Sequence, residues 1–377
     1  MISRALSARP ILGLLLPLLM LLALAPVTRP VEGSGDTFQF WYAGHLVASG
    51  HSPYDQRAWH DASADYGAIA ANVARNCGNA EDPFCVWAYP PPTAWLFAPF
   101  GALPPGFGLP LLNAFVVLSA LAGIAAAVVV FGPADPLART ALLTVIVLSH
   151  PFAIDVRAGH FVGLLLIGVS LVAHGIRRAA SLPIVAGALL LVLKPHVVLA
   201  VGLSTVVLLV RDRTWRALGA AAAAIALVVA LSLAISPEAI GAIIGRSGSK
   251  AGIAWATTWA LPLPLAAAVL ALAAAASVLA LRALRSPAAA IAIAAALSLT
   301  IAPYAQPYDA LLVVPALALL WTVVPDRRGL IGVASGAFAL GTWAAVFAGQ
   351  LSPPLESAYA VVPAAELALL AVAARRS

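Results

Sequence analysis

The chain carries very little charge for its length. Only 10% of its 377 residues are Asp, Glu, Lys or Arg, whereas 62% are hydrophobic. Soluble domains carry about a quarter charged residues, so this chain lacks the polar surface that water demands. Apolar runs recur along the whole sequence, and they do not show the period-two alternation of barrel strands. The composition therefore predicts an all-α, polytopic membrane protein whose solvent is lipid.

Motifs for nucleotides and metals are also missing. The sequence holds no Walker, Rossmann or zinc motif, and no DxD pair in an outside loop. We therefore expect no cofactor, and chemistry that is independent of metal. The pI of 9.7 does not indicate a nucleic-acid partner. The basic residues occur in ones, twos and threes between apolar runs, which is typical of membrane-orientation signals.

The apolar runs predict about twelve transmembrane helices within a single integral-membrane domain, residues 1–377. Several runs are shorter than the roughly 20 residues that a span needs. Short or broken helices indicate that some helix ends line a cavity. The expected spans are 10–28, 110–131, 140–153, 161–176, 181–193, 196–210, 216–236, 262–281, 287–302, 309–324, 329–348 and 359–374.

The distribution of charge predicts the orientation of these spans. With the N-terminus inside, 14 of the 21 Lys and Arg residues fall on the inner side, with only 3 of the 15 Asp and Glu residues. The positive-inside rule then places both termini in the cytoplasm, as expected of a multi-pass protein of a bacterial inner (cell) membrane. The run 10–28 is alternatively a cleaved signal peptide, although its length favours retention.

The longest connection, residues 29–109, is the first non-cytoplasmic loop. Within it, residues 36–49 place Phe40, Ala43 and Leu46 at helical spacing. This pattern predicts an amphipathic helix that lies along the membrane surface.

The same loop contains a run of prolines and both cysteines of the chain. Residues 89–100 contain three consecutive prolines, which predict a stiff extended segment rather than a helix. Cys77 and Cys85 are the only cysteines. An oxidising compartment permits a disulfide, so we favour a bridge between them over two free thiols.

Two polar residues stand out beside apolar runs. Asp36 follows the first expected span, where its carboxylate could accept a proton from a hydroxyl nucleophile; the alternative is a helix N-cap. Lys194 lies between two apolar runs, followed by the helix-breaking Pro195 and by His196. A lysine there suits a lipid-linked phosphate, and the alternative is a side chain that snorkels to the interface.

Asp155, Arg157 and His160 cluster in HPFAIDVRAGH, which we expect to contain a short outside loop over 154–160. Arg157 could clamp a phosphate through two hydrogen bonds. The alternative, favoured for Asp155, is a simple ion pair between Asp155 and Arg157.

Tyr304, Tyr308 and Asp309 lie in IAPYAQPYDALL at the entrance of an expected span. An acid that enters an apolar span indicates function. The alternatives are an aromatic belt for the tyrosines and an N-cap role for Asp309.

Five motifs occur in order through most of the chain. They are Asp36 with FWYAGHLVASGHSPY, then AYPPPTAWLFAPFGALP, RAGHFVGLLLIGVSL, GALLLVLKPHVVL and IAPYAQPYDALLVVPAL. Together they resemble glycosyltransferase family 87, the polytopic GT-C enzymes that use polyprenyl-phosphate sugars. Two positions depart from that pattern: Tyr308 stands where other members carry His, and Ala302 stands where a polar residue is usual.

The resemblance implies inverting transfer of a sugar, with mannose expected, from a polyprenyl phosphate to a lipid or glycan acceptor on the non-cytoplasmic face. It also implies that Asp36 is the general base. The side chains expected to contact the donor phosphate or the substrates are Lys194, His196, Arg157, His160, Tyr304, Tyr308, Asp309 and Tyr89.

Two other functions are compatible with this sequence: a secondary transporter and a non-catalytic membrane scaffold. Transporters often contain internal repeats with charges near the membrane midplane. This sequence shows no clear repeat, and its polar residues gather at one face after a long outside loop, which favours the enzyme.

Overall fold

The computed structural model describes residues 36–67, 87, 89–242, 258, 261–324, 328–351 and 357–375. Regular structure in these ranges is helical throughout, and no strand occurs in them. The all-α prediction is therefore confirmed for the described residues. The expected span 10–28 and the cysteines Cys77 and Cys85 lie outside them.

The helices follow one another closely along the chain, and several are separated only by a short turn or a 3₁₀ segment. The elements are α2 (Thr37–Ala48), α3 (Gln56–Tyr66), α5 (Pro91–Gly101), α6 (Pro105–Phe131), α7 (Pro136–Val147), α8 (His150–Ala158), α9 (Val162–Arg178), α10 (Ser181–Leu191), η2 (Pro195–Val197), α11 (Leu199–Arg211), α12 (Trp215–Ile235), α14 (Leu263–Leu284), α15 (Pro287–Ile301), η5 (Pro307–Val313), α16 (Val314–Val323), α17 (Arg328–Gly336), η6 (Ala337–Gly341), α18 (Thr342–Leu351), η7 (Ser357–Ala360) and α20 (Val361–Ala374).

Four of the described helices are long and apolar enough to cross a membrane: α6, α12, α14 and the continuous run Gly329–Ala348. The pair α7 and α8, which meet at an angle of 59°, makes a fifth if it counts as one broken span. Five more apolar helices have only 10 to 17 residues. The chain thus has the helices of a membrane protein, but the twelve expected spans are not confirmed.

The outer helix α12 shows why lipid is the fitting solvent. Its Leu227, Leu231 and Ile235 side chains are exposed. A large apolar patch on a soluble protein would drive association, whereas lipid covers it without cost.

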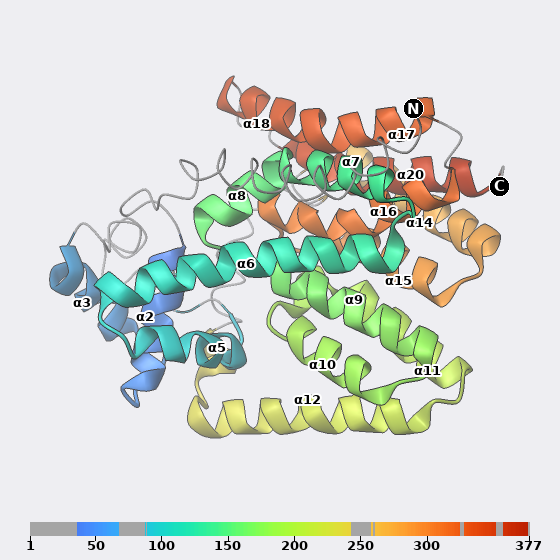
Figure 1. The fold of residues 1–377 in the computed structure, drawn as a ribbon. Coiled ribbons are helices and arrows are strands. Elements are labelled where there is room, and N and C mark those ends of the chain that lie inside the picture. The colour runs from blue at the N-terminus through green and yellow to red at the C-terminus, as the bar shows by residue number, and fades with distance from the viewer. Residues whose placement is uncertain are drawn as a thin grey trace, which may run out of the picture.

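The centre of the fold is α15, which packs against α9, α11, α14, α16 and α20. Nearly every side chain from Ala289 to Thr300 is buried, and most are alanine or isoleucine. Small side chains let several helices approach one axis closely. Figure 1 shows α6 crossing the molecule, with α2 and α5 near its beginning and α9 along its side.

The prediction for α2 was partly wrong. Residues Thr37–Ala48 do form a helix, but Phe40, Trp41 and Tyr42 are all buried by protein, so the helix does not present an exposed polar face. Against α5, Gly44 and Gly101 allow close contact, because a Cβ on either would overlap backbone atoms of the other helix. Helical spacing of apolar residues does not distinguish a helix covered by lipid from one covered by protein.

The prediction of an extended segment over 89–100 was also wrong, because α5 begins at Pro91. Pro90 is in an extended conformation and Pro91 occupies the first helical turn. The first N–H groups of a helix have no partner inside it, so proline costs nothing there. Three prolines in a row were therefore a helix start.

One of the expected spans, 140–153, contains a break that the sequence did not predict. Within the expected span 140–153, α7 ends at Val147. The next helix, α8, carries Asp155 and Arg157, which were expected in a loop. At the break, the indole Nε1 of Trp343 donates to the carbonyl oxygen of Leu148 at 3.0 Å. Backbone groups freed inside a membrane protein need such partners.

A second break lies between α10 and α11, at Lys194, where the sequence predicted that Pro195 separates two apolar runs. The Thr93 hydroxyl donates to the Leu193 carbonyl oxygen at 3.0 Å. On the other side of the break, Ser298 Oγ accepts from the N–H groups of Ala200 at 2.9 Å and Val201 at 3.3 Å. Side chains of α5 and α15 thus hold both ends of the break.

Candidate functional site

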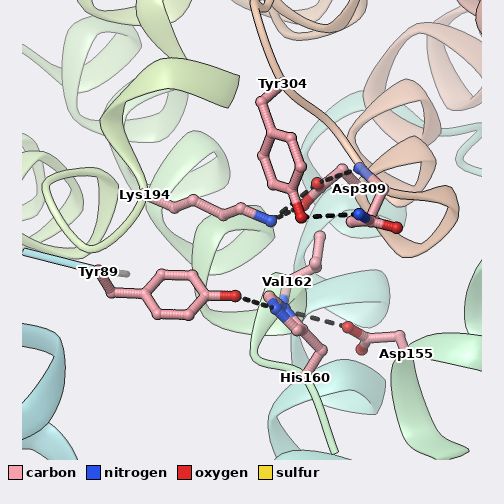
Figure 2. Close-up of polar contacts among 8 residues, drawn as sticks. Tyr89, Asp155, His160, Val162, Lys194, Tyr304 and Asp309 are labelled. Atoms are coloured by element: carbon pink, nitrogen blue, oxygen red, sulfur yellow. Dashed lines mark hydrogen bonds and ion pairs between the residues drawn. The ribbon is translucent and has the colours of Figure 1, made fainter. Parts of the chain in front are cut away.

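A buried ion pair joins two segments that lie 115 positions apart. Lys194 Nζ lies 2.6 Å from Asp309 Oδ1 and 2.7 Å from Asp309 Oδ2, and both side chains are 0% exposed. The alternative of a lysine that snorkels to the interface is therefore wrong. Figure 2 shows Lys194 reaching across to Asp309.

The local backbone positions each partner of the ion pair. Lys194 precedes Pro195, where the missing N–H and the ring prevent α10 from continuing. Asp309 is the third residue of η5 in a capping box: its Oδ2 accepts from the Gln306 N–H at 2.8 Å. The predicted N-cap role of Asp309 belongs instead to Gln306, whose Nε2 donates to the Tyr304 hydroxyl at 2.7 Å.

Aromatic rings enclose the ion pair. Lys194 Nζ lies 4.7 Å from the centre of the Tyr308 ring, a cation–π geometry. The Tyr308 ring stacks on that of His160, with 3.8 Å between ring centres. His160 Nε2 in turn lies 2.8 Å from the Tyr89 hydroxyl. Tyr308 is therefore a buried contact of the site and not part of an aromatic belt, whereas Tyr89 and Tyr304 are partly buried.

Asp36 lies near Tyr89 and Tyr308, close enough for its charge to act on both. Its backbone N–H donates to the Ala158 carbonyl oxygen at 2.7 Å, at the end of α8. The next residue of the turn, Gly159, has φ +72° and lies so close to Thr37 that a Cβ would overlap it. Asp36 does occupy the N-cap position of α2, as the alternative predicted, but its side chain makes no capping hydrogen bond there.

The carboxylates of Asp36 and Asp309 both act electrostatically on the Tyr89 hydroxyl. The hydroxyl end of Tyr89 is surrounded by protein, and this burial raises the pKa of Tyr89 well above its ordinary value. The negative charges of Asp36 and Asp309 raise that pKa further. One tyrosine hydroxyl is thus within electrostatic reach of both carboxylates.

Asp155 and Arg157 do not form the ion pair that the sequence predicted. Arg157 is exposed and forms no ion pair with any described residue. Asp155 is 0% exposed, and its Oδ1 accepts from the Val162 N–H at 3.3 Å. Successive α8 residues point in different directions, which separates the two side chains.

Three buried polar atoms in this region have no hydrogen-bond partner among the described residues. They are Asp155 Oδ2, His160 Nδ1 and His196 Nε2. The His196 ring lies 6.0 Å from that of Tyr304. Buried polar atoms are normally satisfied, so this unused capacity suits a ligand that supplies donors and acceptors.

The structure thus gathers most of the expected site residues into one polar centre, defined by Asp36, Tyr89, His160, Lys194, His196, Tyr304, Tyr308 and Asp309. Arg157 is the exception. Sequence reasoning missed Thr93 and Ser298, which hold the break beside Lys194. A lone hydroxyl in an apolar helix gave no signal before its partners were known.

No group of three or more His, Cys, Asp or Glu side chains within the described ranges has an arrangement that could hold a metal ion. No protein-family model, curated protein or solved structure matches this chain at a significant level. The resemblance to glycosyltransferase family 87 therefore stays a prediction.

Proposed function

We propose that the chain is an inverting membrane glycosyltransferase. It would transfer a sugar, with mannose as the first candidate, from a polyprenyl phosphate to a lipid or glycan acceptor. The observation that carries this proposal is the polar centre itself. A carboxylate, Asp36, stands at its edge, and the lysine that suits a lipid phosphate, Lys194, is buried within it.

The proposed step needs one base and one site for negative charge. Asp36 takes the proton of the acceptor hydroxyl, and the oxygen then attacks the anomeric carbon. The bond from that carbon to the phosphate oxygen breaks on the opposite face, and the polyprenyl phosphate leaves with the electron pair. The leaving group is already an anion, so it needs electrostatic stabilisation, which Lys194 is suited to supply.

The proposed orientation places this chemistry on the non-cytoplasmic face of a bacterial inner membrane, with both termini in the cytoplasm. It assigns a GT-C type arrangement of about twelve spans, in which the short helices α10 and α11 count as two. Arg177 and Arg178 precede α10, and Arg211 ends α11, so the basic residues lie at the ends remote from Lys194.

One observation favours a second candidate, a secondary transporter. Transporters often bind their substrates where a membrane helix is interrupted. Here the helical path from α10 to α11 is interrupted beside a buried ion pair. A transporter would move a solute across vesicles without altering it, whereas a transferase would make a new covalent product.

The test is transfer of a labelled sugar by the purified full chain in nanodiscs. Radiolabelled polyprenyl-phosphate mannose is mixed with a lipid extract from the native membrane, and the products are separated by chromatography. A labelled glycolipid that appears only with the protein supports the proposal. If donors carrying several different sugars yield no product and do not bind, while vesicles containing the protein accumulate a solute, the transporter takes its place.

A further inference from the structure

Lys194 has a special position among the cations of this protein. It is the only buried Lys or Arg side chain in the part of the chain that the structure describes. An anion that enters the polar centre therefore meets this ammonium group. Yet the ammonium group already donates to both carboxylate oxygens of Asp309, so its charge is paired with that of Asp309.

The two partners differ in how firmly they are held. Asp309 Oδ2 also accepts from the Gln306 N–H, and the Asp309 N–H bonds back to Gln306, so the carboxylate is fixed to its own turn. Lys194 reaches Asp309 through a flexible four-carbon stem, and among the described residues its ammonium group has, besides Asp309, only the cation–π contact with Tyr308. If the pair separates, the lysine is the partner that moves.

We propose that Asp309 occupies the place of the substrate phosphate on Lys194 and so competes with it. This inference rests on the proposed function, because it takes the donor to be a lipid phosphate. A carboxylate that binds the ammonium group through both oxygens presents it with the same chemistry as two phosphate oxygens. When the donor binds, the ammonium group moves from Asp309 to the phosphate.

The exchange has a consequence for protons. Asp309 would be left buried beside Asp155 with no cation, which is unfavourable for an ionised carboxylate. Anion binding is therefore coupled to the uptake of about one proton, as linkage requires when binding favours the protonated form. The titratable groups that interact electrostatically with the pair or with its neighbours are Asp36, Tyr89, Asp155, His160, His196, Tyr304 and Tyr308.

The opposite role for Asp309 makes the opposite prediction. If Asp309 only held Lys194 in position for the phosphate, its removal would weaken binding of the anion. If it competes, its removal strengthens binding. The sign of one change in affinity decides between the two roles.

The experiment measures binding of a sugar-free polyprenyl phosphate, and of the uncharged polyprenol, to the full chain in nanodiscs. The proteins are wild type, Asp309→Asn and Lys194→Gln, each checked for thermal unfolding. We expect Asp309→Asn to bind the phosphate about tenfold more tightly, a typical size for coupling between two binding events, and Lys194→Gln to bind it more weakly. Affinity for polyprenol should stay the same in all three.

Equal or weaker phosphate binding by a folded Asp309→Asn overturns the inference while leaving the proposed function intact. If no protein distinguishes the phosphate from polyprenol, both fail together.

A second measurement, on the wild type, tests the inference if the Asp309→Asn variant does not fold. Calorimetric titration of the wild type with a polyprenyl phosphate methyl ester, a diester that like the donor has no proton to exchange near neutral pH, is run in buffers of different ionisation enthalpy and gives the number of protons that the protein takes up. Uptake of about one proton supports the exchange, and uptake of none overturns it.

Discussion

Two buried carboxyl groups, Asp309 and Glu366, stand in contrasting surroundings. Asp309 is 0% exposed and bonds to Lys194 and to a backbone N–H. Glu366 on α20 is 1% exposed, and neither carboxyl oxygen has a partner among the described residues. An ionised carboxylate without a partner is far more costly than a neutral one, so only Asp309 is equipped to hold a charge. Burial alone thus does not identify a charged site.

The largest effect that separates the two acids should follow removal of Asp309. Asp309→Ala leaves the Lys194 ammonium buried and without a counter-charge, so we expect a loss of about 3–5 kcal/mol in the free energy of unfolding. Unfolding in SDS, followed by circular dichroism, measures it. Asp65→Ala on the exposed side of α3 is the matched control, expected within about 0.5 kcal/mol of wild type.

A double variant sharpens this prediction. Lys194→Met combined with Asp309→Leu removes both charges at once, so neither is left uncompensated. The double variant should lie about 2 kcal/mol or more closer to wild type than Asp309→Ala. Equal losses in both would mean that packing, not charge, sets the stability of this pair.

A smaller effect is expected at the helix break that carries Lys194. Thr93→Val keeps the shape of the side chain but leaves the Leu193 carbonyl oxygen without its partner, at a cost of about 1–3 kcal/mol. Thr93→Ser keeps the hydroxyl and should stay near wild type. The same unfolding assay measures both, and equal losses would show that the methyl group, not the hydrogen bond, matters.

The smallest effect is expected at Glu366. Glu366→Met has a similar volume and breaks no hydrogen bond, so the free energy of unfolding should change by less than about 1.5 kcal/mol. A loss as large as that of Asp309→Ala would reveal a partner for Glu366 and remove the contrast between the two acids.

The sequence identified the members of the polar centre better than their geometry. Lys194 and Asp309 stood out because ionisable residues are rare in apolar runs. Their contact across 115 positions, and the exposure of Arg157, depend on how α8, α10 and η5 pack, which no local pattern contains.

Helix limits were predicted less well for a related reason. An apolar run indicates where lipid or a core is tolerated, but not where the backbone breaks inside it. Pro195 marked the break at Lys194, but the break near Leu148 has no such signal and is stabilised by a distant side chain, Trp343. Several other apolar runs form helices of only 10 to 17 residues, so twelve apolar runs do not appear as twelve long helices.

The central claim is that Asp36 is the base for sugar transfer, and one comparison tests it most directly. Initial rates of label transfer from polyprenyl-phosphate mannose are measured for wild type, Asp36→Asn and the exposed control Asp65→Asn, with folding checked in each. We predict that Asp36→Asn lowers the rate by about 10²–10⁴-fold while Asp65→Asn transfers at the wild-type rate. A folded Asp36→Asn protein that transfers the sugar at the wild-type rate would contradict the claim.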